Sequence, residues 1–316
     1  MTMYSRCFVA LGGGDEIGAS SYLLAVDHKR VLIDAGLRLR SSRVYPDFEC
    51  VSSIGMVALW ECDCFCLTHA HLDHSGALPA VHQKAPNTPL YATPPTKDIA
   101  SILLHDTIKI AHKRGEFMGD TRLREYTEEA IHSALDNLKV RPFTERFEAA
   151  AGVYVTFYPA GHILGAAMVL VEINDFRALF TGDFCTDGQL TVAGYSLPHS
   201  IAPIDLMVCE STYAYRASES EQTASQQQQH LVEQVAHTIS GGGKVLIPAF
   251  AVGRAQEILL LLRSSFAQSH LDRFPVWSDG MVNQVCEVYN QHRAYLRPTL
   301  DEREGDIFFD RILGER

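Results

Sequence analysis

The sequence has no apolar run long enough to cross a membrane and no recognisable secretory leader. A transmembrane helix needs roughly 18 or more consecutive apolar residues, and no part of the 316-residue chain contains such a run. Residues 1–6 lack the basic start and the apolar stretch of a signal peptide. We therefore expect a soluble, cytoplasmic protein that does not bind a membrane.

Basic residues are in deficit, because 27 Lys and Arg stand against 38 Asp and Glu, a formal net charge of −11. A surface that binds a nucleic-acid duplex is usually basic, so this balance weakens the case for broad electrostatic binding. Bound divalent cations would offset negative charge where a phosphate docks. An anionic substrate therefore stays compatible with the composition.

The eight cysteines do not have the spacing of a disulfide framework. Most lie in apolar, strand-like contexts, and we expect reduced thiols in the core. Cys62, Cys64 and Cys66 alternate, so they would share one face of a strand. A zinc site built from them would need two-residue gaps and turns, which makes the core reading the better one.

One stretch, residues 67–76, carries an unusual density of metal-ligand side chains directly after the apolar run 62–67. At the end of a buried strand, residues two apart point the same way, so His69 and His71 could reach one ion. Asp73 and His74 would project beside that pair, close enough for a second ion. Imidazole and carboxylate suit zinc better than manganese or iron.

Two simpler explanations of this stretch have to be weighed. The histidines could cluster by chance in a polar loop, or Asp73 could merely cap a helix that begins at Ser75. Three histidines and an aspartate at this spacing favour the metal site, and a capping role for Asp73 is compatible with it.

Further polar residues also stand at the ends of apolar strands, namely Asp34, His162, Asp183 and Glu210. In a core of two packed sheets, these residues could converge with the histidines on one edge. On local grounds, Asp34 fits a turn-forming residue as well as a carboxylate that orients a ligand histidine.

The remaining histidines and glycines are predicted to have ordinary roles. Residues 97–114 and 127–138 have helical apolar spacing, and His105, His112 and His132 are expected to be isolated surface or half-buried side chains. Two glycine runs, 12–14 and 241–243, fail the dinucleotide and Walker patterns because a strand follows each of them. Arg254, near a predicted helix N-terminus, is a candidate phosphate contact.

The composition changes at residues 213–230, which are rich in Ser, Glu and Gln. We therefore divide the chain into a first domain, 1–212, and a second, 213–316. In the second domain, residues 245–250 and 274–277 are predicted to be strands, each followed by a helix.

Taken together, these motifs resemble the metallo-β-lactamase superfamily. The likeness is carried by residues 68–76, Gly161-His162, Thr181-Gly182-Asp183 and Asp34. Residues 210–213 and 247–257 narrow it to the β-CASP branch, which holds nucleic-acid hydrolases such as RNase J and the endonuclease of mRNA cleavage and polyadenylation. The likeness runs from about residue 6 to about residue 292.

The resemblance implies an α/β fold, a metallo-β-lactamase αβ/βα sandwich of two mixed sheets flanked by helices, with the start of an α/β β-CASP domain. It implies two zinc ions, one held by His69, His71 and His162 and one by Asp73 and His74, with Asp183 bridging them. Asp34 matches the first motif of the family, beside the ligands. Glu210 matches its acidic β-CASP motif, and Asp73, Asp183 and Glu210 are the expected catalytic carboxylates.

The likeness ends before two further histidines of the family, and His292 matches neither. We expect the chain to correspond to the N-terminal two-thirds of such an enzyme, with weak activity unless a homodimer or a partner chain supplies the rest. The expected function is zinc-dependent hydrolysis of phosphodiester bonds in RNA, with DNA as the alternative substrate. Other readings are a non-catalytic RNA-processing subunit that keeps the fold and a small-molecule metallo-hydrolase.

Overall fold

The structure is a computed structural model of the whole chain, and it describes residues 6–38, 43–56, 58–113, 126–201, 203–214, 223–268, 270–301 and 305–308. The chain forms two compact units. The first comprises residues 1–186 and 194–210, and the second comprises 187–193 and 211–316. None of the helices in the described part of the chain combines the length and the apolar character that crossing a bilayer requires.

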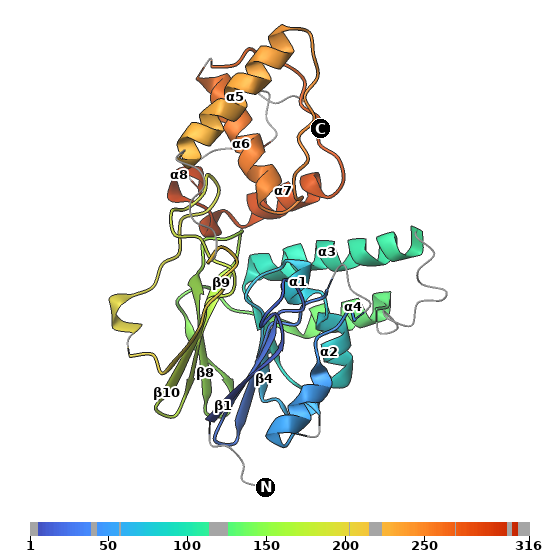
Figure 1. Cartoon of the computed structure of the whole chain (residues 1–316), viewed down its shortest axis with the longest axis vertical. Coiled ribbons are helices and arrows are strands. Elements are labelled where there is room, and N and C mark those ends of the chain that lie inside the picture. Colours follow the sequence, from blue (N-terminus) through green and yellow to red (C-terminus); the bar gives the residue numbers. More distant parts are fainter. Residues whose placement is uncertain are drawn as a thin grey trace. The chain divides into compact units, whose positions relative to one another are not determined.

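The first unit is built on two mixed sheets (Figure 1). The first sheet has the order of its strands along the chain: β1 (Arg6–Gly12), β2 (Ser21–Val26), β3 (Lys29–Ile33), β4 (Cys64–Cys66), β5 (Leu90–Ala92) and β6 (Leu138–Val140). Strands β1 to β3 are antiparallel, and β3 to β6 are parallel.

The second sheet has the order β11-β10-β9-β8-β7. Its strands are β7 (Arg146–Ala150), β8 (Val153–Pro159), β9 (Ala167–Ile173), β10 (Phe176–Phe180) and β11 (Leu206–Val208). Only the β10–β11 pair is parallel among these neighbours. Both sheets are therefore mixed, and the predicted α/β class is confirmed.

Helices of the first unit cover the outer face of the first sheet (Figure 1). They are α1 (Leu72–Ser75), α2 (Leu78–Lys84), α3 (Pro94–Lys113) and α4 (Glu128–Asn137). The first unit also has short 3-10 turns at Phe48–Ile54, Leu59–Glu61 and His199–Ile201. Helix α4 begins where the sequence predicts, because the Thr127 side chain accepts a hydrogen bond from the Ala130 N–H and caps the first turn.

Two hydrophobic cores follow from the alternation of side chains along the central strands. Val31 and Ile33 face the core between the two sheets, whereas Leu32 faces the core beneath the helices. Cys64 and Cys66 likewise face the inter-sheet core, and Phe65 points the other way. Cys62 precedes β4 and lies in the core beneath the helices, so the prediction that all three cysteines share one face is wrong for Cys62. No disulfide joins the cysteines in the described residues.

The second unit consists of helices α5 (Ala224–Ser240), α6 (Arg254–Ala267), α7 (Val282–Gln291) and α8 (Pro298–Asp301), with a 3-10 turn at Arg293–Tyr295. The buried Glu257 carboxylate accepts hydrogen bonds from the backbone N–H groups of Leu190 and Thr191, at 2.6 and 2.7 Å. These bonds attach the segment 187–193 to the second unit. The assignment of residues 213–316 to a partial β-CASP domain stays a prediction.

The two strands predicted in the second unit do not form. Residues 245–250 and 274–277 pair with no other strand in the described part of the chain. Leu246, Phe250 and Trp277 are 92%, 83% and 88% exposed. An apolar run becomes a strand only where a neighbouring strand takes up its backbone hydrogen bonds, so the run alone misled the prediction.

Candidate metal centre

The metal-ligand histidines begin where β4 ends. The chain leaves β4 after Cys66, bends at Thr68 and enters the short helix α1, with His71 as its N-cap residue. The turn fits closely against a neighbouring loop, because a Cβ atom on Gly36 would lie 1.7 Å from the backbone oxygen of Asp73. Glycine at position 36 is therefore what allows α1 to present its side chains beside the strand ends.

His69, His71 and His162 form the first group of converging side chains, and their ligand atoms lie within 4.8 Å of one another. Nδ1 of His71 is 3.2 Å from Nε2 of His69 and 3.1 Å from Nε2 of His162. The three rings meet nearly edge to face, with interplanar angles of 77° to 82°. Ligands placed tetrahedrally at about 2.0–2.1 Å from zinc lie roughly 3.3–3.4 Å apart, so these nitrogen atoms fit one ion.

His69, His74 and Asp183 form the second group. One carboxylate oxygen of Asp183, Oδ1, is 3.3 Å from Nε2 of His74, and the other, Oδ2, is 3.6 Å from Nε2 of His162. Oδ2 also lies 4.0 Å from Nε2 of His69. The Asp183 carboxylate therefore reaches both groups, one oxygen to each.

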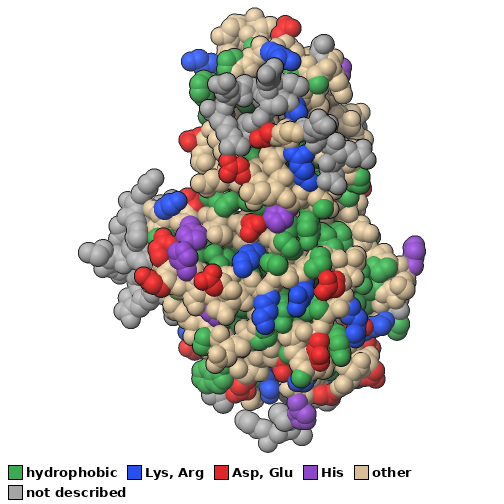
Figure 2. All heavy atoms as spheres, turned by 180° about the vertical axis from the view of Figure 1, so that it is seen from behind, with side chains coloured by type: hydrophobic (Ala, Val, Ile, Leu, Met, Phe, Trp, Pro, Cys, Tyr) green, Lys and Arg blue, Asp and Glu red, His purple; other side chains and the backbone are tan. Residues whose placement is uncertain are grey.

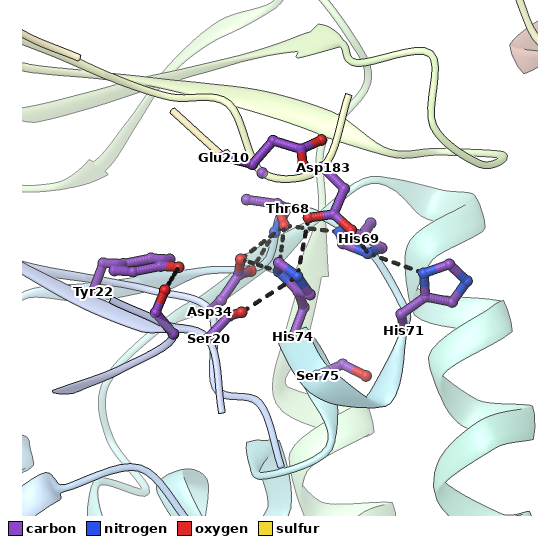
Figure 3. A network of polar contacts seen from close by, with 12 residues as sticks. Ser20, Tyr22, Asp34, Thr68, His69, His71, His74, Ser75, Asp183 and Glu210 are labelled. Carbon is purple, nitrogen blue, oxygen red and sulfur yellow. Dashed lines mark hydrogen bonds and ion pairs between the residues drawn. The ribbon is translucent and has the colours of Figure 1, made fainter. Parts of the chain in front are cut away.

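The buried carboxylate of Asp34 orients the His74 ring through the nitrogen that faces away from Asp183 (Figure 3). Oδ2 of Asp34 lies 2.7 Å from Nδ1 of His74 and accepts the Thr68 hydroxyl at 2.8 Å, while Oδ1 accepts the Thr68 N–H at 2.7 Å. With Nδ1–H donated to Asp34, Nε2 is the nitrogen that faces Asp183. Asp34 holds a left-handed backbone, φ 61°, which is uncommon outside glycine.

The three histidines of the first group have lowered pKa values, which keep their imidazoles neutral. Burial, together with the neighbouring histidines, lowers the pKa of His69 well below its usual value, and burial chiefly lowers the pKa of His71 to about 4. Burial also lowers the pKa of His162, against the opposing charge of Asp183. Neutral imidazoles are the form in which histidine binds metal.

His74 and Asp183 behave differently because they face each other. Burial acts to lower the pKa of His74, but Asp34 and Asp183 outweigh it and hold that pKa well above its usual value. Burial acts to raise the pKa of Asp183, and the hydrogen bond and charge of His74 outweigh it and lower that pKa. A cation at this point would take the place of the proton on His74.

The structure places the other predicted site residues with mixed results. Glu210 lies beside the centre, since its Oε1 accepts the N–H of Phe184, next to Asp183, at 3.1 Å. Asp73 belongs to neither group of converging side chains, and its backbone oxygen accepts the Ser20 N–H at 2.9 Å. Arg254 is the first residue of α6, in the second unit, and its contact with phosphate stays a prediction.

Residues that sequence reasoning left without a role also belong to the network (Figure 3). Thr68 joins Asp34 to the histidines, with its hydroxyl 3.1 Å from Nδ1 of His69. The Ser20 hydroxyl lies 3.4 Å from Nε2 of His74. The position of Thr68 directly before His69 was the available signal, whereas no local pattern distinguishes Ser20.

Comparison with known proteins gives one family match. A family model described as "Metallo-beta-lactamase superfamily domain" matches residues 23–189. That range contains all the side chains of both converging groups, and the donor set of imidazoles and a carboxylate fits zinc.

Two curated relatives and one solved structure extend the comparison. A transcription termination factor, FttA, of Methanosarcina mazei is 31% identical over 293 residues, covering 92% of this chain and 44% of that protein. An RNase J-like protein of Methanocaldococcus jannaschii is 32% identical over 291 residues, covering 92% and 62%. The chain thus spans only part of these relatives. A protein of unknown function from Enterococcus faecalis has a similar fold, with TM-score 0.53, 15% identity, and 92% of this chain and 68% of that one covered.

Proposed function

Since the chain belongs to the metallo-β-lactamase superfamily and its curated relatives are of the β-CASP type, we propose that it is a zinc-dependent hydrolase of phosphodiester bonds in RNA. One observation carries the proposal, namely that the Asp183 carboxylate reaches both groups of histidines. Two cations held about 3.5–4 Å apart by a shared ligand are the usual device for phosphoryl-group hydrolysis.

We assign two zinc ions to these side chains. The ligands assigned are His69, His71 and His162 for one ion and Asp73 and His74 for the other, with Asp183 shared. All of these except Asp73 belong to the two converging groups, and Asp73 is assigned from the resemblance to the family. When bound, the ions would supply Lewis acidity to a phosphate group and to water. Asp34 keeps Nδ1 of His74 protonated, so that Nε2 stays available as a donor to the ion.

Glu210 is assigned the handling of the proton at the leaving oxygen. Its carboxylate is held by the backbone N–H of Phe184, one residue after Asp183, and it belongs to neither group of converging ligands. A general acid acts from within hydrogen-bond reach of the group that it protonates, and a carboxylate outside the ligand groups keeps its oxygens available for that proton. We count Asp73, Asp183 and Glu210 as the catalytic carboxylates.

Single-stranded RNA is favoured as the substrate over a nucleic-acid duplex and over a small molecule. One relative is named RNase J-like and another is named a transcription termination factor. The net charge of −11 argues against broad binding of a duplex, and Figure 2 shows lysine and arginine side chains interspersed with aspartate and glutamate on the face it draws. A single strand bound mainly at the centre needs less basic surface, because the metals themselves neutralise phosphate.

The test is hydrolysis of end-labelled single-stranded RNA by the purified chain with zinc restored. We expect slow, zinc-dependent cleavage that Glu210→Gln reduces by about 10²- to 10⁴-fold without changing the zinc content. His71→Ala should abolish cleavage and lower the zinc content, whereas His28→Asn, an exposed histidine outside both groups, should do neither. If the fully zinc-loaded chain left the RNA uncleaved, the proposal of ribonuclease activity would be contradicted. That result would favour a non-catalytic RNA-processing subunit.

A further inference from the structure

A second cluster of metal-ligand side chains lies away from the centre, on helices α3 and α4. His105 of α3 and Glu128 and His132 of α4 each offer a ligand atom, and these atoms lie within 4.8 Å of one another. Nε2 of His105 is 3.5 Å from Oε2 of Glu128. Sequence reasoning expected both histidines to be isolated, and the packing of the two helices instead brings them together.

The two histidines have the same tautomer, and the helices fix it. Nδ1 of His105 donates to the backbone oxygen of Ser101 at 2.6 Å, and Nδ1 of His132 donates to that of Glu128 at 2.7 Å. Each bond runs one helical turn back along its own helix. In the neutral ring, the other nitrogen, Nε2, then carries a lone pair and no proton. Both rings therefore present a metal-binding nitrogen away from their own helix.

The rings are arranged much like those of the metal centre. The His105 and His132 rings lie 5.2 Å apart with an interplanar angle of 75°, whereas the ring pairs formed by His71 lie 5.0 Å apart at 77° and 82°. Two lone pairs and a carboxylate that converge without a cation repel one another. A cation between them removes that repulsion.

The spacing on the helices explains the geometry. Glu128 and His132 are four residues apart, so they share one face of α4. His105 comes from the middle of α3, which packs against α4. Thr127 caps α4 and so fixes the first turn, which contains Glu128. Figure 2 shows, on the face it draws, a surface region where histidine side chains stand together beside acidic ones.

We propose that His105, Glu128 and His132 form an additional surface site for a divalent transition-metal ion of the zinc class, which links α3 to α4. Two imidazoles and one carboxylate are the ligands of many three-residue zinc sites, in which water takes the remaining position. The site is independent of the proposed hydrolase function. Because it joins two helices, its occupancy stabilises the packing of α4 on α3.

The simpler explanation is an ion pair between protonated His105 and Glu128. A partly exposed pair of this kind contributes little, and this explanation assigns no role to His132. The metal site needs all three side chains, so loss of His132 distinguishes the two explanations.

The experiment counts zinc in the full chain by equilibrium dialysis followed by elemental analysis, at pH 7.5. We expect the wild type to bind one more ion than His105→Asn or His132→Asn, while His28→Asn, exposed and outside the cluster, binds as many as the wild type. Loss of a group that only contacts a metal ligand typically lowers metal affinity by roughly 10- to 100-fold. Glu128 is proposed as a ligand itself, so Glu128→Gln should lower the affinity for the additional ion by at least that factor.

A second measurement guards against an effect on folding. Zinc should raise the melting temperature of the wild type more than that of His132→Asn, while the two metal-free proteins melt together. Equal zinc counts in the wild type and both histidine variants would overturn the site, and so would an equal zinc-induced shift in melting temperature. His71→Ala, which removes a ligand of the main centre, should leave the additional ion in place.

Discussion

Oδ2 of Asp34 lies 2.7 Å from Nδ1 of His74, although the two residues are 40 positions apart in the chain. The contact joins the end of β3 to α1. Asp34 is buried and has a left-handed backbone, so the chain accepts an unfavourable conformation in order to place this carboxylate. Its task is to hold the His74 ring with Nε2 toward Asp183.

Replacing Asp34 by Asn tests that task. The amide keeps the size of the side chain but removes the charge that holds the proton on Nδ1 of His74. We expect zinc affinity at the centre to fall by about 10- to 100-fold, measured by competition with a chromophoric chelator. Asp27→Asn is the matched control, because Asp27 also has a positive φ, of 54°, and is exposed. Unchanged affinity in Asp34→Asn would show that the contact does not serve the metal.

Gly36→Ala tests the close approach of α1 to the neighbouring loop. The new Cβ atom would meet the backbone oxygen of Asp73 at 1.7 Å and the Ser20 nitrogen at 2.8 Å, and backbone atoms cannot move aside cheaply. We expect a loss of unfolding free energy of about 1–3 kcal/mol or more, measured by urea denaturation, together with weaker zinc binding. Gly241→Ala is the control, since its Cβ would have only ordinary contacts, at 3.5 and 3.6 Å. If Gly36→Ala were as stable as the control, α1 would not depend on glycine.

Strand-end chemistry is the part of the site that the sequence can predict. An apolar run followed by a histidine or a carboxylate places that side chain at a sheet edge, and the structure brings His69, His71, His162 and Asp183 together as expected. The same apolar runs predict the strands that precede these residues, β4, β8 and β10. It works because backbone period and burial are local properties.

Features that depend on distant partners could not be predicted in this way. The cluster of His105, Glu128 and His132 requires knowing which faces of α3 and α4 meet, and helical spacing alone does not state that. The apolar run 245–250 looks like a buried strand, but strand formation depends on a neighbour that the run does not specify. The role of Ser20 likewise follows from a contact with a residue 54 positions away.

The shifted pKa values predict how the stability of the metal-free protein changes with pH. The folded-state pKa values of His69, His71 and His162 are lowered. Below about pH 6.5, the unfolded chain therefore takes up protons that the folded chain does not, and stability falls as the pH falls. His74 acts in the opposite sense, because its folded-state pKa is raised. Its contribution is fully present below about pH 6.5 and is lost as the pH rises through the folded value.

Three histidines outnumber one, so we expect the metal-free protein to lose unfolding free energy between pH 7 and pH 5. Urea denaturation at intervals of half a pH unit measures this. His71→Asn should make the decline shallower, because it removes a group whose folded-state pKa is about 4. If the unfolding free energy stayed constant or rose as the pH fell from 7 to 5, the contribution of His74 would outweigh that of the other three histidines.

Asp183→Asn tests the shared position of that carboxylate. Its two oxygens face different groups, Oδ1 toward His74 and Oδ2 toward His162. An amide offers one oxygen and one NH₂, which cannot ligate both ions. We therefore expect Asp183→Asn to lower zinc binding at both positions, whereas His71→Asn, which contributes to one group only, should lower it at one. Titration of each metal-free variant with Co²⁺, followed by its visible absorption, measures the two positions separately. If Asp183→Asn lost no more metal than His71→Asn, the carboxylate would serve one ion, and the two-ion proposal would lose its main support.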